Sequence, residues 1–331
     1  MLASHQIVFT GKRLVSLRQV ELAEPKATEV LVDIRCSLMS TGTENIAFNC
    51  DFELGSDWDQ YVKYPFQPGY AAVGVVRSVG EGVAKVNVGD RVAIRVGHAS
   101  SAVVPETQCH KIPDNLSYDD ALWFALAKIT FLGVRAARLQ LGDHLAVIGA
   151  GPIGQMTLRW ARNAGPGLIS AIEMAETRRA AAEAGGADVV HIGTADVICK
   201  EYHDRKKPLP RVVIDTTGNH HVFASALGLA AKYGTVVLLG VSGHPEKQTL
   251  TSDVIRKGLT IVGVHDSQTP PEWPQEAIIQ LFFSLAAAGR FPLEGLISHR
   301  FAAEDCVAAY RLSNTDRAST MGIVFDWMDG N

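Results

Sequence analysis

The sequence lacks the features that would direct it to a membrane, to nucleic acid or through a secretory pathway. No apolar run approaches the roughly 18 residues that a membrane-spanning helix needs. The opening residues, Met1-Leu-Ala-Ser-His-Gln6, lack a basic region followed by an apolar one, so we expect no secretory signal peptide. The net charge of −4 offers no basic footprint for nucleic acid.

Cysteine is sparse as well, and its five positions never form a C-x-x-C pair. The cysteines are Cys36, Cys50, Cys109, Cys199 and Cys306. A scattered, odd-numbered set favours reduced thiols in a cytoplasmic protein and argues against a structural zinc cluster. With 331 residues, 47% hydrophobic and 20% charged, the chain is long enough for two globular domains of ordinary composition.

The most informative stretch that is present begins with the apolar run Leu145–Ile148, which is typical of a buried parallel strand. Gly149, Gly151 and Gly154 follow as G-x-G-x-x-G, and Gln155–Arg162 is predicted to be a helix. The glycines permit a tight turn, close approach of a pyrophosphate, and close packing of helix on strand. Free N–H groups and the helix dipole favour phosphate charge there. An ordinary glycine-rich turn is the alternative.

An acidic residue completes this nucleotide motif. Glu173 ends the next apolar run, roughly 20 residues past the glycines, where a carboxylate holds the ribose diol of NAD. The same carboxylate would repel a 2′-phosphate, so we predict NAD(H) rather than NADP(H) as cofactor. Arg178 and Arg179 are basic enough to suggest a 2′-phosphate, but a solvated helix face accounts for them.

The pattern of elements predicts two different halves. Residues 6–116 are rich in short β-type runs with frequent glycine and proline, as in a small barrel. Residues 119–135 are long, apolar and helical in character, with Ser117 or Asp119 as N-cap. Strands and helices then alternate to about residue 264, which predicts an α/β fold with a doubly wound parallel sheet. A helix over 275–288 and a strand over 322–326 are expected to follow.

Six short landmarks follow one another along the chain: Val30–Ile34, Pro68-Gly69, Val88–Val92, Gly149–Gly154, Asp215–Gly218 and Leu296–Ala302. In this order they resemble the medium-chain dehydrogenase/reductase superfamily, the group of the alcohol and sorbitol dehydrogenases. The resemblance implies a GroES-like β-barrel catalytic domain over residues 1–125, a Rossmann domain over 126–266, and a return to the catalytic domain over 267–331. It also implies a homodimer joined at the apolar edge strands 235–240 and 259–264 of the Rossmann sheet.

The catalytic zinc of that family is not expected here. Ser40 stands about where the family has a cysteine ligand, Tyr70-Ala71 replace a His-Glu pair, and the third ligand position falls near Ala125. Zinc needs about three N, S or carboxylate ligands, which these residues do not supply. Ser40-Thr-Gly-Thr-Glu44 and Pro68-Gly-Tyr70 resemble the zinc-free branch that contains bacteriochlorophyllide a dehydrogenase.

Without zinc, a side chain must hydrogen-bond to, or protonate, the substrate oxygen. The candidates are the residues that replace the zinc ligands and their surroundings, namely Ser40, Thr43, Glu44, Tyr70 and Lys128. Lys128 lies in an otherwise apolar helix, where burial would lower its pKa and make it an acid/base. Glu44 would anchor a substrate hydroxyl or pair with Lys128. The alternatives are a lysine whose head reaches water, a core or rim Tyr70, and a Glu44 that is solvated or structural.

The resemblance adds residues around the substrate and the cofactor. His98 lies in the barrel half, where the family shapes its substrate pocket. Besides the glycines and Glu173, the expected cofactor residues are Pro152, Ile153, Thr216, Gly240, Val241 and Val264.

Taken together, these features predict zinc-independent, NAD(H)-dependent interconversion of a secondary alcohol and a ketone. A polyol, sugar or cyclitol is favoured as substrate, because several polar side chains replace the zinc shell and would address several hydroxyls. Two alternatives stay open at this point. One is an NADPH-dependent quinone or enone reductase, and the other is a non-catalytic NAD(H)-binding sensor.

Overall fold

The computed structural model describes residues 2–327, and their contacts divide the chain into two compact units. The first unit comprises Met1–Ala125, Ile279–Ala288 and Glu294–Asn331. The second comprises Leu126–Ile278 and Gly289–Leu293. The sequence pattern predicts a change at residue 125 and a return at 267, so the second unit runs further along the chain than that pattern suggests.

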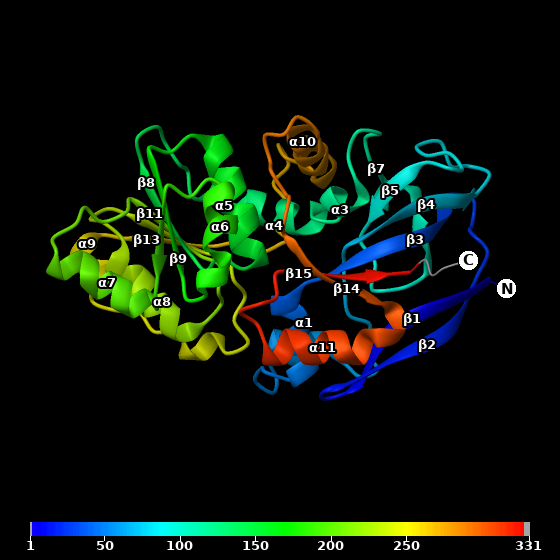
Figure 1. The fold of residues 1–331 in the computed structure, drawn as a ribbon, viewed down its shortest axis with the longest axis horizontal. Helices are drawn as coiled ribbons and strands as arrows, with labels where there is room; N and C mark the ends of the chain where they lie inside the picture. The colour runs from blue at the N-terminus through cyan, green and yellow to red at the C-terminus, as the bar shows by residue number, and fades with distance from the viewer. Residues whose placement is uncertain (1, 328–331) are drawn as a thin grey trace. The chain divides into compact units, whose positions relative to one another are not determined.

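A mostly antiparallel sheet of seven strands forms the centre of the first unit (Figure 1). Its strands are β3 (Glu29–Met39), β4 (Ala72–Val79), β5 (Arg91–Ile94), β6 (Ser101–Pro105), β7 (His110–Lys111), β14 (Ile297–Ala302) and β15 (Gly322–Asp326). Strand β3 pairs with β4, β6 and β15, and its apolar side chains Val30, Val32 and Ile34 are buried. Because β3 ends at Met39, the position of Ser40 is fixed by the last residue of this buried strand.

Smaller elements close the first unit around an aromatic core. They are the hairpin β1 (Leu2–Gly11) and β2 (Leu14–Leu22), and helices α1 (Thr41–Asn49), α2 (Asp57–Tyr61), α3 (Tyr118–Ala121) and α11 (Cys306–Thr315). Helix α11 contacts both β2 and α1. The Tyr310 ring meets Phe9 edge-on at 4.8 Å and stacks on Phe48 at 5.4 Å, measured between ring centroids. This packing brings a residue near the end of the chain against the first helix.

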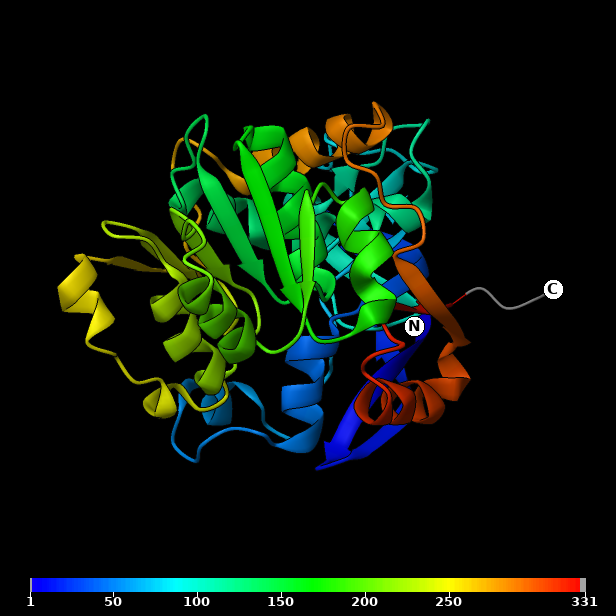
Figure 2. The same ribbon diagram turned by 60° about the vertical axis from the view of Figure 1, so that its left-hand side comes forward.

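The second unit is a six-stranded parallel sheet with the order β10-β9-β8-β11-β12-β13. Its strands are β8 (His144–Ile148), β9 (Leu168–Glu173), β10 (Val189–Ile192), β11 (Val212–Asp215), β12 (Thr235–Leu238) and β13 (Thr260–Gly263). Figure 2 shows β8 and β9 side by side with their arrowheads pointing the same way. The strand order reverses between β8 and β11, and ligands of such sheets bind at that switch point, outside the carboxyl ends of the strands.

Helices cover this sheet, and several of their apolar residues are buried against it. They are α4 (Phe124–Ala136), α5 (Pro152–Ala164), α6 (Arg179–Ala184), α7 (Ala195–Asp204), α8 (His220–Leu229) and α9 (Asp253–Lys257), and α10 (Gln275–Ala287) follows in the chain. Ile198 and Tyr202 of α7 join Phe223 of α8 in one buried cluster with strand residues Ile148 and Val213. The predicted α/β fold class with a doubly wound parallel sheet is confirmed.

One predicted detail was wrong, and one helix was missed. The single helix expected over residues 119–135 is broken into α3 and α4, because the Trp123 N–H bonds to the Asp120 carbonyl three residues back and tightens the turn. The N-cap prediction at Ser117 is confirmed, since its side chain accepts a hydrogen bond from the Asp120 N–H at 3.0 Å. Helix α7 was not predicted, although Ile198 and Tyr202 lie four residues apart and are both buried.

Strand β13 is an edge of the six-stranded sheet, and two of its four residues, Thr260 and Gly263, are exposed. Homodimer formation through this edge stays a prediction. No helix among residues 2–327 has the length and apolar character to cross a membrane.

Close approach of β3 to β4 predicts a specific stability effect. A Cβ atom added at Gly74 would lie 2.2 Å from the Asp33 carbonyl oxygen, so Gly74→Ala forces two backbones apart. We expect a loss of about 1–3 kcal/mol in the free energy of unfolding, the usual cost of overpacking. Gly42→Ala is the matched control, because nothing lies within 4 Å of the added atom and alanine favours helix α1. Equal urea midpoints for the two variants would contradict the observed approach.

Candidate functional site

The glycine turn of the second unit has the geometry that a nucleotide site requires. Gly149 has φ +88°, and a Cβ atom at Gly154 would lie 1.9 Å from the Gly149 carbonyl oxygen. Helix α5 begins at Pro152 with Gly151 as its N-cap, and no side chain caps its first N–H groups. The Thr216 hydroxyl donates to the Gly149 carbonyl at 3.0 Å and supports the turn from the neighbouring strand. The predicted strand–turn–helix is confirmed.

Glu173 ends β9 beside this turn, as its position in the sequence predicts. The carboxylate is 6% exposed and accepts hydrogen bonds from the N–H groups of Ala150 at 2.7 Å, Met174 at 2.8 Å and Ala175 at 2.9 Å. Arg178 Nη1 lies 3.3 Å from the second carboxylate oxygen. The solvated helix face expected for Arg178 was wrong, because its side chain is 18% exposed and pairs with Glu173.

The remaining residues that the sequence predicts to contact a cofactor follow strands of the sheet at its carboxyl edge. Gly240 follows β12 and donates to the Asp215 carbonyl at 3.0 Å, and Val264 follows β13 and donates to the Leu238 carbonyl at 3.0 Å. Val241 is 48% exposed. Burial raises the pKa of Asp215 to about 6, against the opposing effect of hydrogen bonds from Thr217. These residues fit a nicotinamide dinucleotide, with Ile153 in the first turn of α5.

Lys128 belongs to the same edge of the second unit. Its side chain is 2% exposed, so the expected burial is confirmed and the alternative of a head that reaches water is wrong. The ammonium donates to the Asp266 carboxylate at 2.7 Å and to the Asp266 backbone carbonyl. Asp266 follows β13 by three residues, so Lys128 lies near the carboxyl end of that strand. The cost of burying its charge is offset by an ion pair.

A second group of polar residues lies in the first unit, at the positions where the sequence resemblance predicts that the zinc ligands of the family are replaced. Ser40 Oγ and Tyr70 Oη are 2.5 Å apart. Tyr70 also hydrogen-bonds to the Thr43 side chain, and the Arg95 guanidinium lies over its ring at 5.2 Å from the centroid. Burial raises the pKa of Tyr70 above its usual value. The Ser40 and Thr43 hydrogen bonds and the Arg95 charge oppose that rise, and the charge of Glu44 adds to it. Tyr70 therefore keeps its proton at neutral pH.

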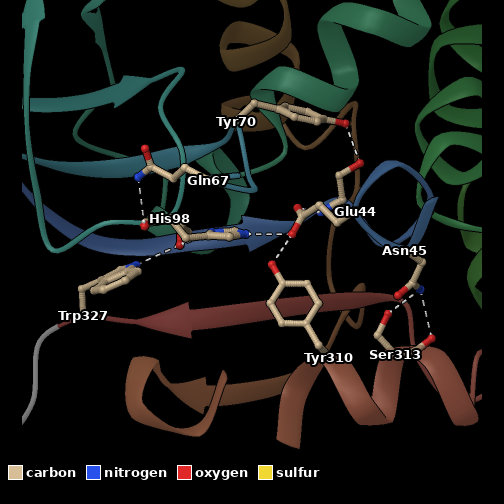
Figure 3. Close-up of polar contacts among 10 residues, drawn as sticks. Glu44, Asn45, Gln67, Tyr70, His98, Tyr310, Ser313 and Trp327 are labelled. Atoms are coloured by element: carbon tan, nitrogen blue, oxygen red, sulfur yellow. Dashed lines mark hydrogen bonds and ion pairs between the residues drawn. The ribbon is translucent and has the colours of Figure 1, made fainter. Parts of the chain in front are cut away.

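Behind this pair lies a buried carboxylate with its own partners (Figure 3). Glu44 is 2% exposed, and its Oε1 accepts the Ser40 N–H at 2.7 Å. Its Oε2 accepts a hydrogen bond from Tyr310 and lies 3.1 Å from His98 Nε2. None of these partners is Lys128, so the pairing of Glu44 with Lys128 that the sequence left open is not observed.

His98 is fully buried rather than facing an open pocket, since its side chain is 0% exposed. Its Nδ1 lies 2.8 Å from Ser37 Oγ, which accepts the indole N–H of Trp327 at 2.8 Å. An ionised carboxylate only accepts, so Nε2 of His98 carries the hydrogen that faces Glu44. Both ring nitrogens are thus used inside the protein, and a contact between His98 and substrate stays a prediction that this burial does not favour.

The donors around Ser40 and Tyr70 do not fit a catalytic zinc ion. Only one carboxylate and one imidazole, Glu44 and His98, belong to this cluster, and they face each other. Among the described residues of the first unit, no three His, Cys, Asp or Glu side chains bring ligand atoms within 4.8 Å of one another. A catalytic zinc needs about three such ligands and an open position.

Several residues of the two sites were not predicted. Tyr310, Ser37 and Trp327 complete the Glu44 cluster, and Arg95 lies over Tyr70. Tyr310 and Trp327 come from the last segment of the chain, far from Glu44 in sequence, so no local signal marks them. For Ser37, the one signal in the sequence was a run of polar residues at the end of the long strand β3.

Comparisons with known proteins agree with this two-unit arrangement. A family model described as an alcohol dehydrogenase GroES-like domain matches residues 26–115, and one described as a zinc-binding dehydrogenase matches residues 152–284. The chain is 25% identical to sorbitol dehydrogenase from Mus musculus over 293 residues, which cover 78% of this chain and 80% of that protein.

Solved structures share the fold over nearly the whole chain. A putative zinc-binding dehydrogenase from Sinorhizobium meliloti 1021, bound to NADP, superimposes with a TM-score of 0.83 at 20% identity, covering 98% of this chain and 100% of that one. A short chain alcohol dehydrogenase from Escherichia coli CFT073, complexed with NADH, gives a TM-score of 0.82 at 20% identity, covering 98% and 99%. The two family models and the relatives show that this chain belongs to the medium-chain dehydrogenase/reductase superfamily and is an oxidoreductase of that type.

Proposed function

We propose that the protein interconverts a secondary alcohol and a ketone with NAD(H), without a catalytic zinc ion, and that its substrate is a polyol, sugar or cyclitol. The Ser40–Tyr70 hydrogen bond of 2.5 Å carries this proposal, because it puts a proton donor where the zinc-dependent relatives of the family have ligands. The similarity to a sorbitol dehydrogenase supports a polyhydroxylated substrate.

Tyr70 handles the proton in this mechanism. A nicotinamide bound in the second unit would supply the hydride acceptor for the alcohol carbon and the hydride donor for the ketone. In reduction, the Tyr70 hydroxyl donates its proton to the substrate oxygen, while the Ser40 hydroxyl donates to the phenolate oxygen that is left. Arg95, over the ring, stabilises that phenolate charge. In oxidation the same residues act in reverse, and Tyr70 must lose its proton before it accepts one from the alcohol.

The second unit holds the cofactor. The glycine turn and the uncapped start of α5 receive the pyrophosphate, and Glu173 receives the ribose hydroxyls. Because Lys128 is paired with Asp266, we assign it to holding the segment after β13 rather than to proton transfer.

The first test is turnover of D-sorbitol and other sugar alcohols with NAD+, in the presence of a strong chelator. We expect activity that chelation does not abolish, and elemental analysis should show far less than one zinc per chain. Activity lost on chelation and restored by zinc would contradict a zinc-free mechanism. Reduction of quinones or enones with NADPH, and none of alcohols with NAD+, would identify the reductase alternative. NADH binding without any turnover would identify a sensor.

The second test concerns cofactor choice. Glu173→Ala removes the carboxylate that repels a 2′-phosphate and releases Arg178 beside the turn, so the ratio of kcat/KM for NADH over NADPH should fall by tenfold or more. Glu176→Ala is the matched control, because Glu176 is exposed and pairs with Arg179 nearby. A wild-type preference for NADPH would refute the assignment of Glu173.

The third test separates Tyr70 from Lys128. Tyr70→Phe removes the acid/base, so kcat should fall by about a hundredfold or more, with NADH affinity nearly unchanged. Since burial raises the pKa of Tyr70 above its usual value, the wild-type oxidation rate should climb with pH up to at least pH 10, the usual tyrosine value, and this rise should vanish in the variant.

Lys128→Ala should instead lower the melting temperature and change kcat by less than tenfold, because it leaves the Asp266 carboxylate without its ion pair. A hundredfold loss of kcat in Lys128→Ala, with a normal rate in Tyr70→Phe, would reverse the two roles.

A further inference from the structure

The start of helix α1 is built in an unusual way. Ser40 is its N-cap residue, yet its side chain makes no capping hydrogen bond. A serine at this position normally accepts a hydrogen bond from an N–H of the first turn. Here Oγ is directed to Tyr70 instead, at 2.5 Å. The helix gives up a stabilising cap, and the serine hydroxyl becomes available to the phenol.

Glu44 compensates by holding the backbone of Ser40 from both sides. Its carboxylate accepts the Ser40 N–H at 2.7 Å, and its own N–H donates to the Ser40 carbonyl at 2.9 Å. The orientation of the Ser40 residue is therefore determined by Glu44, while the Ser40 hydroxyl remains free of any role in the helix.

The other carboxylate oxygen of Glu44 is anchored in the protein interior. Tyr310 and His98 donate to Oε2, and His98 is tied through Ser37 to Trp327. Burial, and next the charge of Glu44, raise the pKa of Tyr310 well above its usual value, so its hydroxyl keeps the proton that it donates. Glu44 cannot rotate away from Ser40 without breaking these buried contacts.

The same cluster also supports Tyr70 from its backbone side. A Cβ atom at Gly69 would lie 2.8 Å from the His98 ring, and Gly69 has φ +92°. The backbone N–H of His98 donates to the Pro68 carbonyl at 2.9 Å. His98 thus contacts the segment that leads into Tyr70, while Glu44 holds Ser40, so one cluster orients both partners of the hydrogen bond.

We propose that Glu44 is a positioning residue, which acts through Ser40 and His98 to hold the Tyr70 hydroxyl in the orientation for proton transfer. This role rests on the proposed function of Tyr70. Glu44 itself does not exchange a proton with substrate.

The test uses Glu44→Gln, which keeps the shape of the side chain. A carboxamide offers one acceptor oxygen and an NH2 donor, so it cannot accept from Ser40, Tyr310 and His98 together. Asn45→Ala is the matched control. Asn45 is the next residue of α1 and makes an equally buried link, to Ser313 Oγ at 2.9 Å, that does not lead to Ser40 (Figure 3). Both variants are expected to lower the melting temperature.

The first measurement needs no substrate. The seven tyrosines are replaced by 3-fluorotyrosine, and the 19F resonance of Tyr70 is assigned with Tyr70→Phe. We expect Glu44→Gln to shift or split this resonance, and Asn45→Ala to leave it in place. Tyr61 is an internal control, because the charge of Glu44 acts on it across space. A Tyr70 resonance that moves no more than that of Tyr61 would overturn the positioning role.

The second measurement is a double-mutant cycle on D-sorbitol oxidation with NAD+. Glu44→Gln should lower kcat by roughly 10- to 100-fold, the usual cost of misplacing a reacting group, with KM within about threefold. In the Tyr70→Phe background it should have no further effect on kcat, because Glu44 acts only through Tyr70. If Glu44→Gln lowers kcat by the same factor in the wild-type and the Tyr70→Phe backgrounds, the proposal is overturned and Glu44 has only a structural role. If Tyr70→Phe alone leaves kcat unchanged, the proposed function of Tyr70 fails, and the resonance of Tyr70 still decides whether Glu44 holds it.

Discussion

One buried carboxylate connects the separate parts of the first unit. Glu44 accepts hydrogen bonds from the end of β3, from the loop that carries His98, and from helix α11. A buried carboxylate is stable only when its charge is met by donors of this kind. The three elements must therefore be in place together. The candidate proton donor Tyr70 is linked to them through its hydrogen bond with Ser40.

The second unit uses backbone groups for the same purpose. Glu173 accepts three backbone N–H groups, and the glycine turn approaches so closely that no side chain fits at Gly154. Such a site is rigid because its donors belong to the chain itself. In both units a carboxylate of low exposure organises the residues that we assign to function; Glu173 accepts from backbone N–H groups and pairs with Arg178, whereas Glu44 is held by the Ser40 N–H and two side chains.

Local patterns in the sequence predicted what depends on local physics. The strand, turn and helix around Gly149, Gly151 and Gly154 were predicted because spacing and φ requirements are local, and so was the Ser117 cap. Glu44 and Tyr70 were identified as candidates from their positions. Their partners were not, because Tyr310 and Trp327 reach the cluster only through tertiary packing. Arg178 was assigned to solvent because a sequence cannot show that Glu173 lies beside it.

The last segment of the chain has a consequence for biosynthesis. Tyr310 donates to a carboxylate that lies 266 residues earlier. At about 5–20 residues per second, Glu44 emerges from the ribosome roughly 15 to 50 s before its partner is made. During that interval the second unit can fold, but the buried side of Glu44 lacks a donor and the aromatic core around Phe9 and Phe48 lacks one ring. The first unit is therefore completed after the second, and a truncated or stalled product would hold a folded second unit and an incomplete first unit.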